Sequence, residues 1–398
     1  MRNKPRIRFK GFTEDWEQRK LGDFTNQINT FVNPEDAKLP LWSLTAEAGL
    51  IEKSDRYERD FLVKKKDQFK RIETNTLVYN PMNITIGSID IYTGLYPIAV
   101  SGYYVSIVYD KNIDTDFLKE VLLLPSSLKM YKNYATGSLI ERQRVQYPTF
   151  SKLQLLLPNL DEQKAIGQFF KSLNLDITLH QRKLEKLKLA KKALLQKLFP
   201  KNGSQFPEIR FKGFTDAWEQ RKLGEVVKSY SGGTPTASNK EYYGGDIPFI
   251  RSAEINSDTT ELYITKKGLD NSSAKIVEKG TILYAMYGAT SGEVGISKIN
   301  GAINQAILAM IPLDYGGKII AQYLRKNKES IIGKYLQGGQ GNLSANIILE
   351  LPIQLPEVKE SDKIAYFLES VDKLITLHQR KLDKLQEVKK GLLQKMFV

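Results

Sequence analysis

The chain contains the same sixteen-residue block twice. Residues 7–22 read IRFKGFTEDWEQRKLG and residues 209–224 read IRFKGFTDAWEQRKLG, with two positions changed. A second block, LHQRKL, occurs at residues 179–184 and again at 377–382, so the repeat spans the chain. Only the stretches between the copied blocks diverge. The sequence therefore predicts one frame carrying two different domains that do one kind of job on two different targets.

A long helical pattern closes each copy. Its apolar positions recur in alternating steps of four and three residues, which is the a/d seam of a coiled coil. Leu157-Pro158 and Leu355-Pro356 precede the two patterns, and Pro200 with Gly203 ends the first, so proline stays outside the helices. The first seam is Ile166, Phe170, Leu173, Ile177, His180, Leu184, Leu187, Lys191, Leu194 and Leu198. The second is Ile364, Leu368, Val371, Ile375, His378, Leu382, Leu385, Lys389, Leu392 and Met396.

Two helices with matching seams are expected to pair, and a pseudo-two-fold repeat requires them to be antiparallel. The block around Trp218 would then lie beside the start of the second helix, and the block around Trp16 would dock near Val398. A helix of about 37 residues is roughly 55 Å long at about 1.5 Å per residue, which limits how far apart it holds the end domains. The predicted fold class is α+β, with mixed α/β domains at residues 1–156 and 202–354 and spacer helices at 157–201 and 355–398.

The divergent domains show short strand-like and helix-like runs. Apolar runs predict strands at residues 76–79, 104–108, 281–284 and 306–311, and short helices near 116–124 and 318–328. Glycine-rich stretches at 232–233, 288–295 and 338–341 predict loops. Loops on a rigid scaffold commonly carry recognition.

Composition narrows the class of partner. A net charge of +14 favours a polyanion, since Lys and Arg supply most non-specific affinity for nucleic acids. The absence of cysteine excludes disulfides and thiolate metal sites and fits a reducing cytoplasm. The N-terminus does not resemble a signal peptide, and no apolar run approaches the ~20 residues needed to span a bilayer. We expect a soluble, cytoplasmic protein.

No catalytic constellation is recognisable. The phosphate-loop pattern is absent, and Asn80-Pro81-Met82 lacks the second proline and the aromatic residue of the amino-methyltransferase motif. The two histidines, His180 and His378, are both seam residues; a metal pair is conceivable, but a polar residue that fixes the helix register is the favoured interpretation. We therefore predict no catalytic residue, no metal and no cofactor in this chain.

Taken together, the frame and the domain motifs resemble the DNA specificity subunit of type I restriction-modification enzymes. The first domain keeps NTLVYN at residues 75–80 and AVSG at 99–102 but lacks the Gly-Gly-Thr-Pro opening. The helix-entry motif appears as Pro158 with Glu162-Gln163, and the second copy departs from it with Glu360-Ser361. The second domain carries more of the motifs: SGGTPT at 231–236, GDIPFI at 245–250, GTILYAMYGATSG at 280–292, GAINQA at 301–306 and GNLS at 341–344.

The resemblance implies a non-catalytic reader of double-stranded DNA. Each target recognition domain would read one half of an asymmetric bipartite site through the major groove, whose edges distinguish all four base pairs. The helical rod would set the spacer and dock two modification subunits that use S-adenosylmethionine. Two restriction subunits using ATP and magnesium would complete a restricting complex. These cofactors would belong to the partners.

The predicted DNA contacts are polar and aromatic loop residues. Glutamine and asparagine suit adenine edges, whereas the lysine run would touch phosphates. In the second domain they are Thr234, Thr236, Arg251, Tyr287, Thr290, Ser291, Gln337, Gln340, Asn342 and Ser344. In the first domain they are Lys64, Lys65, Lys66, Arg71, Tyr79, Asn80, Ser138, Arg142 and Arg144.

Three alternatives stay open at this point. A standalone methyltransferase is disfavoured by the missing motifs. A coiled-coil adaptor without DNA specificity accommodates the seams but leaves the positive charge and the inserts unexplained. A specificity subunit of a modification-only system agrees equally well with the sequence.

Overall fold

The chain forms two compact units. The computed structural model describes residues 3–53, 68–137, 143–201, 203–335 and 342–398. Unit 1 comprises residues 1–181 with 380–398, and unit 2 comprises residues 182–379. The units divide both spacer helices near their midpoints, whereas the domain limits expected from the sequence lie at the helix ends.

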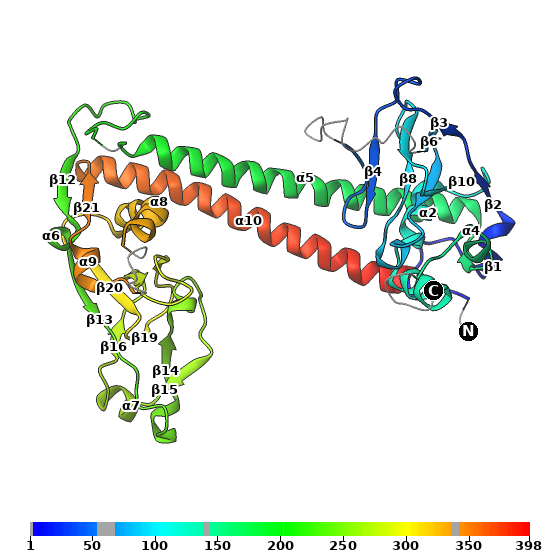
Figure 1. Ribbon diagram of the computed structural model, residues 1–398. Helices are drawn as coiled ribbons and strands as arrows, with labels where there is room; N and C mark the ends of the chain where they lie inside the picture. The colour runs from blue at the N-terminus through cyan, green and yellow to red at the C-terminus, as the bar shows by residue number, and fades with distance from the viewer. Residues whose placement is uncertain (1–2, 54–67, 138–142, 202, 336–341) are drawn as a thin grey trace. The chain divides into compact units, whose positions relative to one another are not determined.

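Unit 1 is built on a four-stranded antiparallel sheet in the order β2-β10-β7-β8. A three-stranded sheet, β3-β6-β9, and two two-stranded antiparallel sheets, β4-β5 and β1-β11, complete its described β-structure (Figure 1). The strands are β1 (Glu17–Lys20), β2 (Thr25–Ile28), β3 (Phe31–Val32), β4 (Trp42–Thr45), β5 (Gly49–Glu52), β6 (Phe69–Ile72), β7 (Thr76–Tyr79), β8 (Ile89–Tyr92), β9 (Ile98–Ser101), β10 (Val105–Tyr109) and β11 (Gln154–Leu157). The helices are η1 (Leu21–Asp23), η2 (Ile84–Ile86), α2 (Thr115–Leu122), α3 (Pro125–Tyr134), α4 (Tyr147–Phe150) and the long α5 (Leu160–Leu198).

Unit 2 repeats this plan with a different second sheet. The antiparallel sheet β13-β20-β17-β18 and the pair β12-β21 match their unit 1 counterparts, but β15-β14-β19-β16 is a mixed sheet in which β14 and β19 are parallel. The strands are β12 (Glu219–Lys222), β13 (Val227–Ser231), β14 (Tyr243–Ile250), β15 (Leu262–Ile264), β16 (Lys275–Val277), β17 (Ile282–Ala285), β18 (Val294–Ile296), β19 (Gly301–Ile303), β20 (Ile307–Pro312) and β21 (Pro352–Leu355). The helices are α6 (Leu223–Val226), η4 (Lys240–Tyr242), η5 (Ser252–Glu254), α7 (Lys266–Asp270), α8 (Gly317–Tyr335), α9 (Ala345–Leu349) and the long α10 (Val358–Met396).

The four strands predicted from apolar runs are confirmed. They correspond to β7, β10, β17 and β20 to within one residue at each end, and the two short helices correspond to α2 and α8. These strands are buried almost throughout, which is why they read as continuous apolar runs without alternation.

The spacer helices pair antiparallel within each unit. In unit 1 the ring of Phe170, near the start of α5, lies 5.8 Å from that of Phe397, just beyond the end of α10. In unit 2 Lys191, near the end of α5, forms an ion pair of 2.6 Å with Asp372 near the start of α10. All twenty seam positions are buried or partly buried, including the two histidines.

Each copied block is clamped to the ends of the spacer helices. In unit 1 the Ile7 N–H donates to the Lys395 carbonyl at 2.9 Å, and the Trp16 ring lies 6.1 Å from that of Phe397. In unit 2 the Ile209 N–H donates to the Lys197 carbonyl at 2.9 Å, and the Trp218 ring lies 5.7 Å from that of Phe199. The expected docking of the Trp16 block near the C-terminus is therefore observed.

In both units a bidentate ion pair also joins the copied block to the start of a spacer helix. Arg8 donates to both carboxylate oxygens of Glu162 at 2.8 and 2.6 Å, and Arg210 does the same to Glu360 at 2.8 Å. The glutamate side chains are 1% and 0% exposed. The glutamate at the helix entry is thus bound by the arginine of its own copied block.

No helix in the described ranges is both long and apolar enough to cross a membrane.

Candidate nucleic-acid interface

Several strand ends of unit 2 bring exposed polar side chains together. The Thr234 hydroxyl, after β13, donates to Gln305 Oε1 at 2.5 Å, and the Tyr287 hydroxyl, after β17, donates to the Gln305 carbonyl at 2.6 Å. Tyr287 also forms an isolated β-bridge with Asn342. We call Thr234, Tyr287, Gln305 and Asn342 the second loop cluster. Three of its four members are residues predicted from the sequence.

The double glycine before Thr234 allows this convergence. The Gly233 N–H donates to the Ile303 carbonyl at 3.1 Å, so the loop runs against the end of β19. A Cβ on Gly232 would lie 1.9 Å from that same carbonyl oxygen, which no side chain permits. Gly232 is therefore required by the close approach of two backbones.

Other predicted residues of the second domain make local contacts. Ser291 is buried and its hydroxyl donates to the Met286 carbonyl, while the Ser344 hydroxyl caps α9 by accepting from the Ile347 N–H. Thr236 is exposed and Thr290 is half-buried. Of these four, Ser291 and Ser344 have hydroxyls that form hydrogen bonds within the domain.

Arg251 is held by carboxylates of its own domain. Its guanidinium lies 2.9 Å from Glu254 and 2.6 Å from Glu261, and hydrogen bonding to Glu254 raises the pKa of the arginine. Contact with DNA would have to compete with these ion pairs. Arg251 as a DNA contact stays a prediction.

Unit 1 presents a different set at the equivalent place. The Val145 N–H donates to the Pro81 carbonyl at 3.0 Å, as the Leu343 N–H does to Met286 in unit 2, so Arg144 occupies the position of Asn342. The Arg144 guanidinium lies 5.7 Å from the centre of the exposed Tyr103 ring. Asn80, which follows β7, accepts a hydrogen bond from the Met82 N–H through its side chain. We call Asn80, Tyr103 and Arg144 the first loop cluster.

The structure corrects the prediction for Tyr79. Its side chain is fully buried in the unit 1 core and stacks on Phe150 at 4.9 Å, and burial raises the pKa of its hydroxyl. The equivalent Tyr284 is also fully buried. Tyr79 lies inside the domain because β7 is buried on both faces, so it cannot contact DNA from the surface.

The remaining first-domain predictions divide into two groups. Arg71, on β6, is partly exposed and pairs with Glu73 at 2.5 Å. Lys64, Lys65, Lys66, Ser138 and Arg142, together with Gln337 and Gln340 of the second domain, lie outside the described residues.

Two members of the loop clusters were missed in the sequence. Gln305 lies within the GAINQA motif, in the turn between the buried strands β19 and β20, and is exposed there. Tyr103 follows AVSG in the equivalent stretch and is 43% exposed. A large aromatic or amide residue within or directly after a glycine-bearing motif was the available signal.

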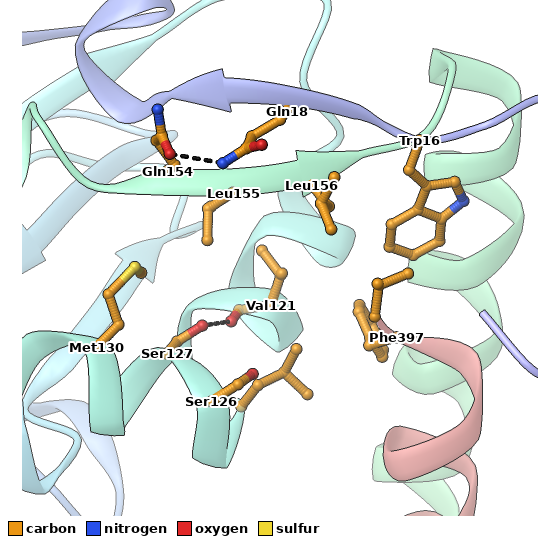
Figure 2. Close-up of a pocket in the computed structure, with 12 residues that line it drawn as sticks. Trp16, Gln18, Val121, Ser126, Ser127, Met130, Gln154, Leu155, Leu156 and Phe397 are labelled. Carbon is orange, nitrogen blue, oxygen red and sulfur yellow. Dashed lines mark hydrogen bonds between the residues drawn. The ribbon is translucent and has the colours of Figure 1, made fainter. Parts of the chain in front are cut away.

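A pocket of unit 1 lies between the β1-β11 pair, α3 and the C-terminus (Figure 2). Two hydrogen bonds join polar groups of its lining: Gln18 donates to Gln154 at 2.5 Å, and Ser127 donates to the Val121 carbonyl at 2.6 Å. No acidic, basic or histidine side chain lines it. In the described parts of the chain, no group of three or more potential ligands could hold a metal ion.

A family model for the type I restriction modification DNA specificity domain matches the chain twice, at residues 13–189 and 215–387. The chain belongs to this family. Each match covers most of one recognition domain and most of the helix that follows it, so each half of the chain matches the family model separately.

Related specificity subunits cover the chain to different extents. The putative type I restriction enzyme MjaX specificity subunit of Methanocaldococcus jannaschii is 23% identical over 96% of this chain and 92% of its own. The MjaIX specificity subunit of the same organism is 29% identical, and that match covers 49% of this chain and about half, 47%, of the relative. The S subunit of a type I restriction-modification system from M. genitalium has the same fold, with a TM-score of 0.68 over 99% of both chains and 13% identity.

Proposed function

We propose that this specificity-family chain is the non-catalytic DNA-reading subunit of a type I restriction-modification complex. Each recognition domain reads one half of an asymmetric bipartite site, and the paired spacer helices set the gap and dock two modification subunits. S-adenosylmethionine, ATP and magnesium bind to the partner subunits and not to this chain. Two restriction subunits join where the system restricts.

One observation carries the proposal. The two units share the frame, the four-stranded sheet and the backbone contact that follows it, yet the side chains at the equivalent loop position differ. Asn342 in unit 2 is replaced by Arg144 beside an aromatic ring in unit 1. Constant scaffolds with divergent surface loops suit two readers of different sequences.

Gln305 is the residue of the second loop cluster best suited to read a base. Thr234 occupies one acceptor position of its Oε1, and Gln305 Nε2 donates no hydrogen bond within the described chain. A glutamine amide with one edge held and one edge free can donate to an acceptor in the major groove. Arg144 of the first cluster can bind a guanine edge or a phosphate.

The test is a base-resolution adenine methylome of a methylation-free host that expresses this chain with its modification partner. We expect an asymmetric bipartite motif. Gln305→Ala should relax or weaken only one half-site, with a loss of about 1–3 kcal/mol of discrimination. Gln27→Ala replaces an exposed glutamine on β2 of the first domain and is the matched control. It should leave the half-site that Gln305→Ala affects unchanged.

An intact complex that methylates no defined motif would contradict the proposal and favour an adaptor without DNA specificity. A bipartite motif that Gln305→Ala leaves unchanged would remove that residue from the reading surface while leaving the function in place. Resistance of DNA affinity to added salt would also argue against a basic DNA reader.

A further inference from the structure

Each recognition domain docks one helix on the spacer helix that follows it. In unit 1 this docking helix is α2, which packs on the first half of α5; in unit 2 it is α8, on the first half of α10 (Figure 1). The docking helices begin at Thr115 and Gly317, 202 residues apart like the first copied blocks, so their positions can be compared one by one.

At the first compared position both units have an ion pair, but the acidic and basic residues are exchanged between the two helices. In unit 1 Asp116 of the docking helix accepts from Lys171 of α5 at 2.9 Å. In unit 2 Lys318 of the docking helix binds Glu369 of α10 at 2.5 Å. The acid thus belongs to the domain in one unit and to the spacer helix in the other.

At the second position a carboxylate and an amide lie close to a seam lysine, and the two units have them on opposite helices. In unit 1 Glu120 of the docking helix accepts from Asn174 of α5 at 2.6 Å and pairs with Lys389 at 3.2 Å. The carboxylate is 13% exposed and the lysine 26%.

Unit 2 has the mirror arrangement at that position. Gln322 of the docking helix donates to Asp372 of α10 at 3.2 Å, and Asp372 pairs with Lys191 at 2.6 Å. Each seam lysine therefore pairs with one carboxylate, and that carboxylate accepts a hydrogen bond from one amide. The two units place the carboxylate and the amide on opposite helices.

The third position is steric. Asp114 caps α2 by accepting from the Phe117 N–H at 2.8 Å, and it faces Gly167 of α5. A Cβ at Gly167 would lie 2.3 Å from Asp114 Oδ1. In unit 2 the residue before α8 is Gly316, and the residue of α10 that corresponds to Gly167 is the buried Ala365. The larger residue before the docking helix thus occurs in the unit that has the smaller residue on its spacer helix.

We propose that these three positions form a matching set that ties each recognition domain to the first half of its own spacer helix. The exchangeable unit of this protein is then residues 23–178 or 225–376, which run from one copied block to the next, and not the recognition domain alone. This inference concerns folding of the chain and holds whichever sequences the domains read.

Moving the first domain alone into the second frame breaks all three matches. Asp116 would face Glu369, and Glu120 would face Asp372, so each pair becomes two like charges. Asp114 would meet the Cβ of Ala365. The steric overlap and the enclosed acid pair should cost most, because Lys171 of the outer pair is 67% exposed and exposed pairs contribute little.

The reciprocal move is also unfavourable. Lys318 would face Lys171, and Gln322 would face Asn174. Lys389 would then have no carboxylate at this position. A partly enclosed lysine without its counter-charge is destabilising.

Two exchanges within the full chain test the proposal. The short exchange swaps residues 23–156 with 225–354, and the long exchange swaps 23–178 with 225–376. We expect the long exchange to unfold near the parent temperature and the short exchange to unfold about 5 °C lower or more. Adding Ala365→Gly, Glu369→Lys and Asp372→Asn (parent numbering) to the short exchange should recover part of that loss. Equal unfolding temperatures for the short and long exchanges would overturn the proposal.

A two-residue test within the native chain does not depend on chimeras folding. Glu120→Gln leaves Lys389 facing two amides and should lower the unfolding temperature. Glu120→Gln with Asn174→Asp restores one carboxylate in the arrangement of unit 2 and should regain most of the loss. A double variant as unstable as the single one would show that the lysine does not depend on where the acid lies, and would refute the matching set.

Discussion

At the scale of single residues, neighbours decide what a charged or polar side chain can do. Arg251 illustrates this: the sequence offers it as a DNA contact, and the structure surrounds it with Glu254 and Glu261. Tyr79 shows the same for burial: it ends a strand, yet its side chain lies inside the domain.

The Glu254 carboxyl gives a prediction about pH. Burial alone raises its pKa, but hydrogen bonds from the Arg251 side chain and from the backbone N–H groups of Arg251 and Glu261 outweigh burial and lower the pKa to about 2. A lowered pKa means that its stabilisation is present above the unfolded value of 4.5 and is lost as the pH falls toward 2. Glu254→Gln should flatten the dependence of unit 2 stability on pH over that range.

Thermal unfolding measured at several pH values checks this. Glu329→Gln, on an exposed part of α8, is the control and should keep the parent slope. Parallel curves for Glu254→Gln and the parent would show that the carboxylate does not hold this ion pair in the folded state.

At the scale of elements, the spacer helices are stabilised by their seam and not by their exposed apolar residues. Leu184 is 4% exposed at a seam position, whereas Leu189, on the same helix, is 69% exposed. Helical periodicity in the sequence separated these two leucines, because seam positions follow from spacing alone.

Leu184→Ala should destabilise the protein by about 2–5 kcal/mol, since it removes buried methyl groups and leaves a cavity. Leu189→Ala should change stability by about 0.5 kcal/mol or less. Chemical denaturation of both variants measures the difference. Equal losses would mean that the helices do not pair through the predicted seam.

At the scale of the whole molecule, duplication gives two units with equivalent clamps. The Arg8–Glu162 and Arg210–Glu360 pairs are geometrically alike, and in both the carboxylate is almost fully enclosed. Each arginine therefore protects its own unit from an unpaired buried charge.

Arg8→Ala should cost unit 1 about 3–5 kcal/mol, and Arg210→Ala should cost unit 2 a similar amount, because each leaves a buried carboxylate without its partner. Lysine at either position should recover only part of the loss, since it cannot form the bidentate pair. Hydrogen exchange resolved by peptide should show faster exchange in the unit that carries the substitution. Uniform acceleration in both units would contradict separate stabilisation.

The amino-acid sequence was enough to predict the duplication, the two long helices, their seams and the main buried strands. These features are local or periodic: a copied block is visible letter by letter, and a heptad seam depends only on spacing. The resemblance to specificity subunits rested on the copied frame, the seams and the domain motifs together, and the family match over both halves confirms it.

The tertiary structure alone decided which loop residues meet and which charges are already paired. Thr234 and Gln305 are 71 positions apart, and their hydrogen bond exists only because β13 and β19 end side by side. The exchanged acids and amides of the docking helices are equally invisible in the sequence. Their meaning depends on which residue faces which, and that is fixed by packing between segments far apart in the chain.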